Sequence, residues 1–447
     1  MKHLILLFTT TFFVLFLQPE KSASQTLETV YVLNEGAFFA GNASVTKYNP
    51  ATGNVQNNVF FYANARPLGD VAQSSFLHNG SLYIVVNNSN KIEVVDPETL
   101  VATDTILIED EAGGPNEIVY IGDGKAYVTN LSGSTISVLD LNANTEVDTF
   151  EVGPNPEGIV ISGERAFVAL SAFGAGNQVA VVNTETDEVE TLLDVHDNPR
   201  SVYLSEDGMI WVVCTGDFGF DEDFNYDPDL ETFGEIHIIS PETLETETII
   251  ETGGHPGALA FNYSEQIAYL NNSGIQIIDL STLETDGFLT ETSYYSIGFA
   301  DGNEPRIYGG IAPDFGSAGS VDILLTNGTI ESSFTAGIGP GFFQFIYGET
   351  DTGTPAYDQP VAFTLQQNYP NPFNPTTQIR FELPESGDVS LSVYNIQGQK
   401  VSTLVNGTRS AGSHTVTFDA SSLASGMYIY RMEAGNTVQT RKMMLVK

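Results

Sequence analysis

"PNEIVYIGDGKAYVTNLSGSTISVLDLNANTEVDTFEV", residues 115–152, holds four short runs rich in β-branched and aromatic residues, separated by Gly, Asn, Asp and Ser. Runs of this composition between turn-forming residues are typical of antiparallel β-strands. Similar units recur as "SLYIVVNNSNKIEVVDPETLVATDTI", "RAFVALSAFGAGNQVAVVNTETDEVETLL" and "QIAYLNNSGIQIIDLSTLET". The repeat therefore predicts a series of four-stranded sheets.

The junctions between these units give the number of repeats. Seven are recognisable, at steps of 39 to 57 residues, which is near the period of a propeller blade. Six of them contain a proline, which can start a strand without donating a ladder hydrogen bond. The seventh junction has Tyr295 in that place, and the six prolines are Pro67, Pro115, Pro156, Pro199, Pro256 and Pro340.

The two ends of the repeat region predict how the ring closes. The chain enters at "TVYVLN" (residues 29–34), which has a second-strand pattern, and the last junction is followed by an unpaired first-strand pattern, "FFQFIYG" (residues 342–348). We expect this last strand to complete the first blade together with three N-terminal strands. An open solenoid would instead need capping repeats, which the sequence does not offer. The predicted fold is all-β, a seven-bladed β-propeller.

The "YVTN" unit at residues 127–130 and its neighbours resemble the YncE-like, YVTN-repeat propellers. "YVLNEGAFFAGNASVTKYNPATG", "PLGDVAQS" and "LYIVVNNSNKIEVVDPETL" resemble surface propellers of Bacteroidota. This resemblance covers residues 27–347. It implies a corrinoid as ligand, beside an outer-membrane receptor, for some members of that group. Propellers host many unrelated functions, so the resemblance is more specific for the fold than for the ligand.

The C-terminal region has a different pattern. "NYPNPFNPTTQIRFELP" (residues 368–384) begins with prolines that hold the chain extended, and six or seven short alternating segments follow with Gly-bearing turns. This arrangement predicts a small Ig-like β-sandwich. Four segments, residues 368–384, 389–405, 425–433 and 442–447, resemble in this order the type A C-terminal sorting domain of the type IX secretion system. Their marker residues are Asn368, Pro370, Asn371, Pro372, Phe373, Asn374, Pro375, Gly398, Gly426, Tyr428, Lys442 and Lys447.

The sorting-domain resemblance implies type IX secretion machinery as a partner, and a passenger released or fixed at the outer cell surface. The alternative is an adhesive or spacer module. Lys2, the apolar stretch at residues 4–17 and "SAS" at residues 22–24 read as a signal peptide. We therefore predict a signal peptide at 1–24, the propeller at 25–348, a linker at 349–362 and the sorting domain at 363–447.

Charge excludes some classes of partner. The chain has 447 residues, with 57 Asp and Glu against 16 Lys and Arg, a formal net charge of −41. Nucleic acids and anionic lipids need a basic surface, so neither is an expected partner. The single cysteine, Cys214, lies in the apolar run "MIWVVC" and is expected to be buried. No further stretch predicts a transmembrane segment in the mature chain.

The predicted topology places the loops between second and third strands on one face, together with the blade junctions. Four of these loops are long and rich in aromatic and Gly residues, including residues 215–235 in blade five. Exposed aromatic rings suit a ligand with an apolar or planar surface. The alternative is that each ring tucks under its own loop. The candidate rings are Phe38, Phe39, Phe173, Phe218, Phe224, Tyr226 and Phe315.

Charged and polar residues of the junctions are expected to point toward the channel, where they would fix a polar group of the ligand or simply line the channel: Arg66, Asn116, Glu157, Arg200 and His255. The blade-five loop also spaces oxygen-bearing side chains by two residues, an alternation that suits calcium but equally a solvated acidic rim. These candidate metal ligands are Asp221, Asp223, Asn225, Asp227 and Asp229.

No zinc, serine-hydrolase or phosphate-binding motif is present in the sequence, so no catalytic residues are assigned. The leading interpretation is an exported propeller that binds a small molecule, glycan or protein through its aromatic loops. One alternative is a calcium-dependent lactonase- or lyase-like enzyme, which would need a ring of inward-facing Glu, Asp and Asn residues around a central metal. Glu35, Glu117 and Glu157 are the first candidates for that ring. The other is a purely structural surface protein.

Overall fold

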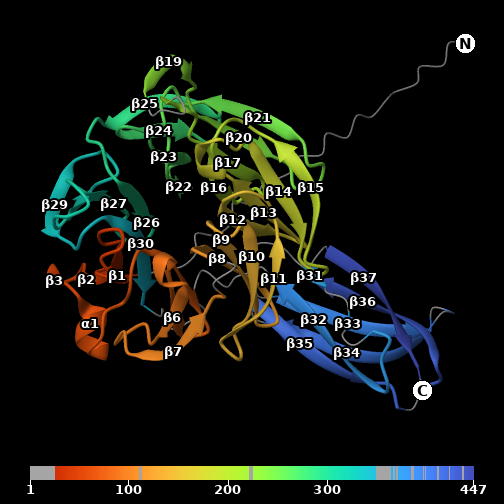
Figure 1. The fold of residues 1–447 in the computed structure, drawn as a ribbon. Helices are drawn as coiled ribbons and strands as arrows, with labels where there is room; N and C mark the ends of the chain where they lie inside the picture. Colours follow the sequence, from red (N-terminus) through yellow and green to blue (C-terminus); the bar gives the residue numbers. More distant parts are fainter. Residues whose placement is uncertain are drawn as a thin grey trace, which may run out of the picture.

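Seven four-stranded antiparallel sheets follow one another along the chain and stand in a ring (Figure 1). The computed structural model describes residues 26–109, 113–220, 225–348, 364–365, 368, 371–383, 387–395, 397, 399–409, 412–421, 423–434 and 437–446. The predicted signal peptide and the whole of the predicted linker lie outside these residues, as do Pro370, Gly398 and Lys447. None of the helices within the described ranges has the length and apolar character needed to cross a membrane.

Within each blade the strands are hydrogen-bonded in series from the centre of the ring outward. From the innermost strand, blade 1 is β30 (Pro340–Tyr347), β1 (Leu27–Asn34), β2 (Ser44–Asn49) and β3 (Asn54–Gln56). Blade 2 is β4 (Ala72–His78), β5 (Ser81–Val86), β6 (Lys91–Val95) and β7 (Ala102–Leu107). Blade 3 is β8 (Pro115–Gly122), β9 (Lys125–Asn130), β10 (Thr135–Asp140) and β11 (Thr145–Glu151). Blade 4 is β12 (Pro156–Ser162), β13 (Arg165–Leu170), β14 (Gln178–Asn183) and β15 (Glu188–Asp194).

Blade 5 is β16 (Pro199–Leu204), β17 (Ile210–Cys214), β20 (Glu235–Ile239) and β21 (Thr246–Glu251). Blade 6 is β22 (Leu259–Asn262), β23 (Ile267–Asn271), β24 (Ile275–Asp279) and β25 (Glu284–Thr290). Blade 7 is β26 (Ser296–Ala300), β27 (Arg306–Ile311), β28 (Ser320–Leu324) and β29 (Ile330–Thr335). A hairpin, β18 (Phe218–Phe220) and β19 (Tyr226–Glu231), is inserted in blade 5, and α1 (Val59–Asn64) follows blade 1.

The prediction of ring closure is confirmed. β30 pairs antiparallel with β1, and the register brings Val32 opposite Phe343 and Val30 opposite Phe345. The first blade is thus built from one C-terminal and three N-terminal strands. Four of the junction prolines, Pro115, Pro156, Pro199 and Pro340, are the first residues of innermost strands. That position requires no ladder donor, which explains why proline recurs there.

The hydrophobic core is divided among the interfaces between blades. In each blade the second and third strands are buried on both faces, whereas the fourth strand, such as β11, is largely exposed. Seven apolar clusters result, one for each pair of neighbouring blades. In one of them Tyr83 and Val85 of blade 2 pack with Val128 and Leu139 of blade 3. Cys214 is fully buried in another.

Buried hydroxyl groups also connect neighbouring blades. The Thr129 hydroxyl donates to the Glu157 carbonyl oxygen of the next blade at 2.7 Å, and the Thr215 hydroxyl donates to that of Pro256 at 2.9 Å. The Ser296 hydroxyl likewise donates to the Pro340 carbonyl oxygen at 2.6 Å. Each of these junction carbonyl oxygens therefore has a hydrogen-bond donor from the neighbouring blade, so none is left as an unpaired buried acceptor.

The C-terminal domain is a two-sheet sandwich, as predicted. One sheet contains β31 (Thr364–Leu365), β32 (Thr376–Leu383) and β35 (Gly412–Asp419). The other contains β34 (Lys400–Arg409), β33 (Gly387–Asn395), β36 (Gly426–Ala434) and β37 (Thr437–Leu445). Phe381 and Tyr430 are fully buried between the sheets, and Tyr428, one of the predicted marker residues, packs in the same core.

The Asn- and Pro-rich segment before β32 runs beside the last strand of the domain. The Phe373 N–H donates to the Met444 carbonyl oxygen at 2.9 Å, and the Val446 N–H donates to that of Phe373 at 2.9 Å. The Asn371 side chain accepts a hydrogen bond from the Met444 N–H at 2.8 Å. Phe373 is buried in the sandwich core. Prolines on both sides of it limit this segment to a few main-chain bonds.

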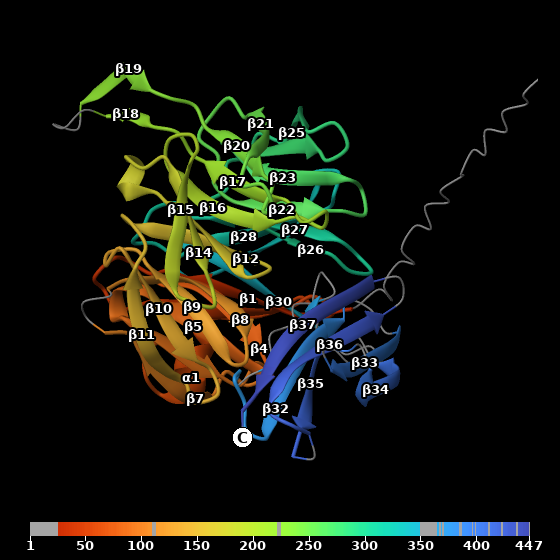
Figure 2. The ribbon, with the colours of Figure 1, turned by 90° about the vertical axis from the view of Figure 1, so that its right-hand side faces the viewer.

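The propeller has two unlike faces. The junction face is formed by the blade junctions and by the loops between second and third strands, residues 35–43, 87–90, 131–134, 171–177, 215–220 with 225–234, 272–274 and 312–319. The sorting domain contacts the opposite face, where Arg441 pairs with Glu164, in the turn between β12 and β13, at 3.1 Å. In Figure 2 the sorting domain and the β18–β19 hairpin extend in opposite directions from the ring. The junction face is therefore not covered by the sorting domain.

Closure of the ring should dominate the stability of the propeller. Phe345 on β30 is buried against Tyr308 of blade 7, with ring centroids 5.4 Å apart. We expect Phe345→Ala to lower the free energy of unfolding by about 3–5 kcal/mol, as measured by urea denaturation. Phe288→Ala, at a half-exposed ring on β25, is the matched control and should change it by less than about 1 kcal/mol. Equal effects of the two substitutions would contradict this account.

Candidate functional site

Aromatic rings stand exposed on the junction face. Phe38 is 63% exposed, Phe39 82%, Phe173 71% and Phe315 54%. They belong to the long loops of blades 1, 4 and 7, so rings that are far apart in sequence lie on the same face of the propeller. The alternative in which each ring tucks under its own loop does not describe these four residues.

Two of these rings are held by unusual backbone conformations. Phe39 has φ of 63° and Phe173 has φ of 53°, both in the left-handed region. A bulky residue in this region is a true outlier, with a cost of about 1–2 kcal/mol, and such strain clusters at functional sites. The loops impose it through their own bonds. The Asn42 side chain accepts from the Ala37 N–H at 2.8 Å, and the Gly176 N–H donates to the Ser171 carbonyl oxygen at 2.8 Å.

The blade-five loop contains a hairpin that the sequence pattern did not indicate. Phe218 of this hairpin stacks on the imidazole of His255, with centroids 4.3 Å apart. One ring nitrogen of His255 lies 3.1 Å from the Thr215 carbonyl oxygen, and the other lies 3.2 Å from the Glu231 carboxylate. Tyr226 donates to the same carboxylate at 2.7 Å. His255 therefore holds the base of the hairpin and does not project freely into the channel.

The candidate calcium ligands are only partly described. Asp221 and Asp223 lie outside the described residues, as does Phe224. Asp227 and Asp229 lie on the extended strand β19, which spaces alternate side chains by about 6.6 Å along a line and does not wrap them around one ion. Asn225 immediately precedes this strand. Within the described ranges, no three His, Cys, Asp or Glu side chains are grouped so as to hold a metal ion.

A group of polar residues lies among the rings. Tyr295 donates to the two carboxylate oxygens of Glu35 at 2.9 and 2.8 Å, and its ring contacts that of Phe315 edge to face at 5.5 Å. Burial raises the pKa of Glu35 above its usual value, although the Tyr295 hydroxyl and the nearby Arg200 oppose this rise. Burial is the main cause of the raised pKa of Tyr295, and the negative charge of Glu35 raises it further.

Arg200 and two further glutamates complete this group. The Arg200 guanidinium donates to Glu157 at 2.9 Å and remains half-exposed. Glu117 accepts a hydrogen bond from the Ile159 N–H at 3.2 Å. Burial, together with the nearby Glu157 charge, raises the pKa of Glu117 to about 7. Of the three glutamates named for the enzyme alternative, Glu157 pairs with Arg200 and Glu35 is influenced by its charge, whereas Glu117 is influenced by the charge of Glu157. Such a group of charged side chains could anchor a polar part of a ligand.

Sequence reasoning missed Tyr295 as a member of this group. The available signal was its position, because Tyr295 stands where the other six junctions have proline. A residue that replaces the repeated proline at one junction only is a candidate for a specific function at that junction. Here the phenol connects the aromatic rings to the Glu35 carboxylate.

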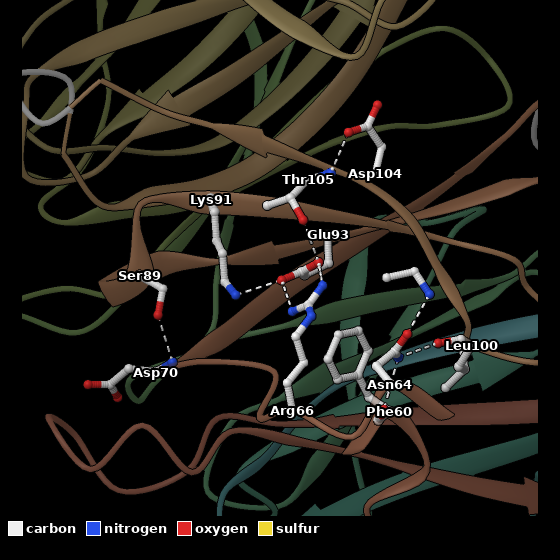
Figure 3. A network of polar contacts seen from close by, with 11 residues as sticks. Phe60, Asn64, Arg66, Asp70, Ser89, Lys91, Glu93, Leu100, Asp104 and Thr105 are labelled. Carbon is white, nitrogen blue, oxygen red and sulfur yellow. Dashed lines mark hydrogen bonds and ion pairs between the residues drawn. The ribbon is translucent and has the colours of Figure 1, made fainter. Parts of the chain in front are cut away.

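The expectation that Arg66 points toward the channel is wrong. Its guanidinium forms a bidentate ion pair with Glu93 on β6, the third strand of blade 2, with both bonds at 2.7 Å (Figure 3). Glu93 is fully buried and also accepts from Lys91 at 2.6 Å and from the Thr105 hydroxyl at 2.9 Å. A buried carboxylate is destabilising unless it is paired, so Arg66 pairs with Glu93 and does not point toward the channel. Asn116 is also buried, and its carbonyl oxygen accepts from the Ser74 hydroxyl.

The charge of the chain is concentrated on the propeller. Residues 26–348 contain 48 Asp and Glu but only seven Lys and Arg, whereas residues 363–447 contain five and seven. All seven propeller cations are already engaged, Lys47 by the Glu98 carbonyl oxygen and the others in ion pairs. An anionic ligand would therefore meet a repulsive field, whereas a neutral or cationic one would not.

Comparisons with known proteins agree with the two-part organisation. A family model described as "Domain of unknown function (DUF5074)" matches residues 28–309, and one described as "Secretion system C-terminal sorting domain" matches residues 367–447. No curated protein matches the chain in sequence.

Several solved structures are similar to the chain at low identity. AztD from Citrobacter koseri is 11% identical over 73% of this chain and 100% of that chain, with a TM-score of 0.47. The hydrazine synthase of Kuenenia stuttgartiensis is 18% identical over 55% and 92%, with a TM-score of 0.35. The Pan2 WD40 domain of Neurospora crassa is 10% identical over 60% and 79%, with a TM-score of 0.43.

Glu117 should make the stability of the propeller depend on pH. Its folded pKa of about 7 lies above the ordinary value of 4.5, so the native state holds a proton that the unfolded chain releases. Stability is therefore lost as the pH rises through this window. We expect wild type to lose about 2–3 kcal/mol relative to Glu117→Gln between about pH 5 and about pH 8 in urea denaturation.

The control for this measurement is Glu188→Gln, at an exposed carboxylate on β15. It should follow the wild-type pH dependence. If Glu117→Gln also follows the wild type over the whole range, the raised pKa is refuted.

Proposed function

This chain belongs to the DUF5074 family, and we propose that its propeller is a surface protein that binds a ligand through the junction face. Its type IX sorting domain directs the chain to the cell surface or to secretion. We take residues 25–348 as the passenger, joined by a linker at 349–362 to the sorting domain at 363–447. The passenger then meets its ligand outside the outer membrane.

The observation that carries the proposal is the strained exposure of Phe39 and Phe173. Folding alone gives no reason to hold two large apolar side chains in the left-handed region and leave them in water. A ligand with an apolar or planar surface would bury both rings and offset that cost. Arg200, Glu35 and Tyr295 would then orient polar groups of the same ligand.

A corrinoid is the first ligand to test. It is a large, mostly uncharged ring system with apolar edges and amide side chains, so it suits a site in which aromatic rings surround a few polar groups. The negative field of the propeller does not oppose a neutral ligand of this kind. An outer-membrane receptor beside the propeller would be the corresponding partner.

The double variant Phe39→Gly with Phe173→Gly tests the site. Glycine tolerates the left-handed region, so the unfolding free energy should be unchanged or raised by about 1 kcal/mol. Binding of cyanocobalamin or cobinamide, followed by calorimetry and by the rise in Tm, should weaken at least about tenfold. Phe288→Ala, at a half-exposed ring on the outer strand of blade 6, should bind as wild type does.

Other outcomes of the same experiment are informative. If no corrinoid raises the Tm of the wild type, the corrinoid is the wrong ligand. A rise with calcium alone, reversed by a chelator, would favour the enzyme alternative. A ligand that binds the double variant as tightly as it binds the wild type would show that the aromatic loops are not the site.

A further inference from the structure

The outer rim between blades 1 and 2 carries a second exposed aromatic surface. Helix α1 is the only α-helix in the part of the chain that the structure describes, and it follows the short strand β3. Phe61 is 46% exposed and Tyr62 is 77% exposed, with their rings edge to face at 5.9 Å. We refer to Phe61 and Tyr62 as the rim ridge. Figure 1 shows α1 at the periphery of the ring, away from the centre of the junction face.

The ridge is fixed from beneath. Phe60 is buried, and the Arg66 guanidinium lies over its ring at 5.1 Å while pairing with the buried Glu93 (Figure 3). The Asn64 amide donates to the Phe60 and Leu100 carbonyl oxygens at 2.9 and 2.8 Å. One short helix is thus tied to blade 2 by an ion-pair network. The exposed rings are presented on a rigid support.

Two cavities adjoin the ridge. One, of about 490 Å³, is lined by Tyr62, Gln56, Lys47 and Glu98 among others. The other, of about 300 Å³, is lined by Phe61, Tyr62 and Asn58 among others. Tyr62 lines both, so the two cavities meet at the ridge. Their volumes are in the range of sites for small ligands, and their arrangement suits an elongated molecule that crosses the ridge.

Uncommitted amide groups flank the ridge. Asn58 gives no side-chain cap to α1, and the exposed Gln56 amide has no hydrogen-bond partner among the residues that the structure describes. Asn57, between them, is occupied, because it accepts from Thr46 at 2.7 Å and donates to the Thr335 carbonyl oxygen at 3.3 Å. Gln56 and Asn58 therefore each offer one acceptor and two donor hydrogens.

We propose that the rim ridge binds a neutral oligosaccharide. A sugar ring has an apolar C–H face that packs on an aromatic ring, and neighbouring hydroxyl groups that match the paired donor and acceptor of an amide. An anionic ligand is disfavoured, because Lys47, the cation of the larger cavity, already donates to the Glu98 carbonyl oxygen and lies over the Tyr31 ring. An uncharged glycan avoids the repulsion of the acidic propeller.

This inference does not depend on the function proposed for the junction face. The rim ridge and the strained loop phenylalanines are separate sets of residues, although Asn42 of the Phe39 loop lines the smaller cavity. A surface protein with both sites would hold its ligand at the junction face while its rim binds surface or extracellular polysaccharide.

The full mature chain should be titrated by calorimetry with neutral oligosaccharides of several linkages, such as maltohexaose, cellohexaose, laminarihexaose and mannohexaose. We expect at least one to bind, and Tyr62→Ala and Gln56→Ala each to weaken it about tenfold or more. Tyr62 and Gln56 are exposed, so Tm should not change in either variant. The Phe39→Gly with Phe173→Gly double variant and Phe288→Ala should bind the sugar as wild type does.

The salt dependence of binding and a comparison with a lysine-rich peptide distinguish a sugar-binding site from a protein-docking surface. The affinity for a neutral sugar should be the same at low and high salt, whereas that for a cationic peptide should fall as salt screens its charge. The proposal is overturned if no neutral oligosaccharide binds, if Tyr62→Ala binds as tightly as wild type, or if only a lysine-rich peptide binds and does so through Tyr62. In the last case the ridge is a protein-docking surface.

Discussion

The pairing of β30 with β1 is the constraint on which the rest of the propeller depends. Every blade buries apolar side chains on both of its faces, so each needs a neighbour on each side. Only a closed ring gives the first and last blades both neighbours. Hydrogen bonds between the two ends of the propeller thus complete one blade and, with it, the interfaces on both of its sides. Closure also removes the open sheet faces on which a secreted protein would aggregate.

Closure explains why the two proposed sites differ in construction. The exposed rings of the junction-face loops take no part in the core, so these loops can hold them in strained conformations. Glu35 and Tyr295 bond there although they are 260 residues apart in sequence. The rim ridge instead lies on a helix in a single connection between blades, and its rigidity comes from the buried carboxylate of Glu93. One surface is made by the ring and the other by a local insertion.

Most of the fold could be predicted from the sequence, but only part of the two sites. Blade number, closure and the C-terminal sandwich follow from a repeated pattern of β-branched residues, turn residues and prolines, which are local signals. The partner of Arg66 is not local, because the choice between the channel and Glu93 depends on which carboxylate is buried. The β18–β19 hairpin and α1 are insertions that no repeat predicts. Whether Phe39 and Phe173 are exposed depends on loop geometry, which hydrophobic periodicity does not report.

The order of the strands along the chain has a consequence for synthesis. β1, β2 and β3 leave the ribosome first but lack their innermost partner until residues 340–347 follow, some three hundred residues later. Contacts of such long range make folding slow, so the passenger passes through a period as an open arc with uncovered sheet faces. The sorting domain is translated only after the closing strand. Every residue needed to complete the propeller has therefore been synthesised before the sorting domain is available to the secretion machinery.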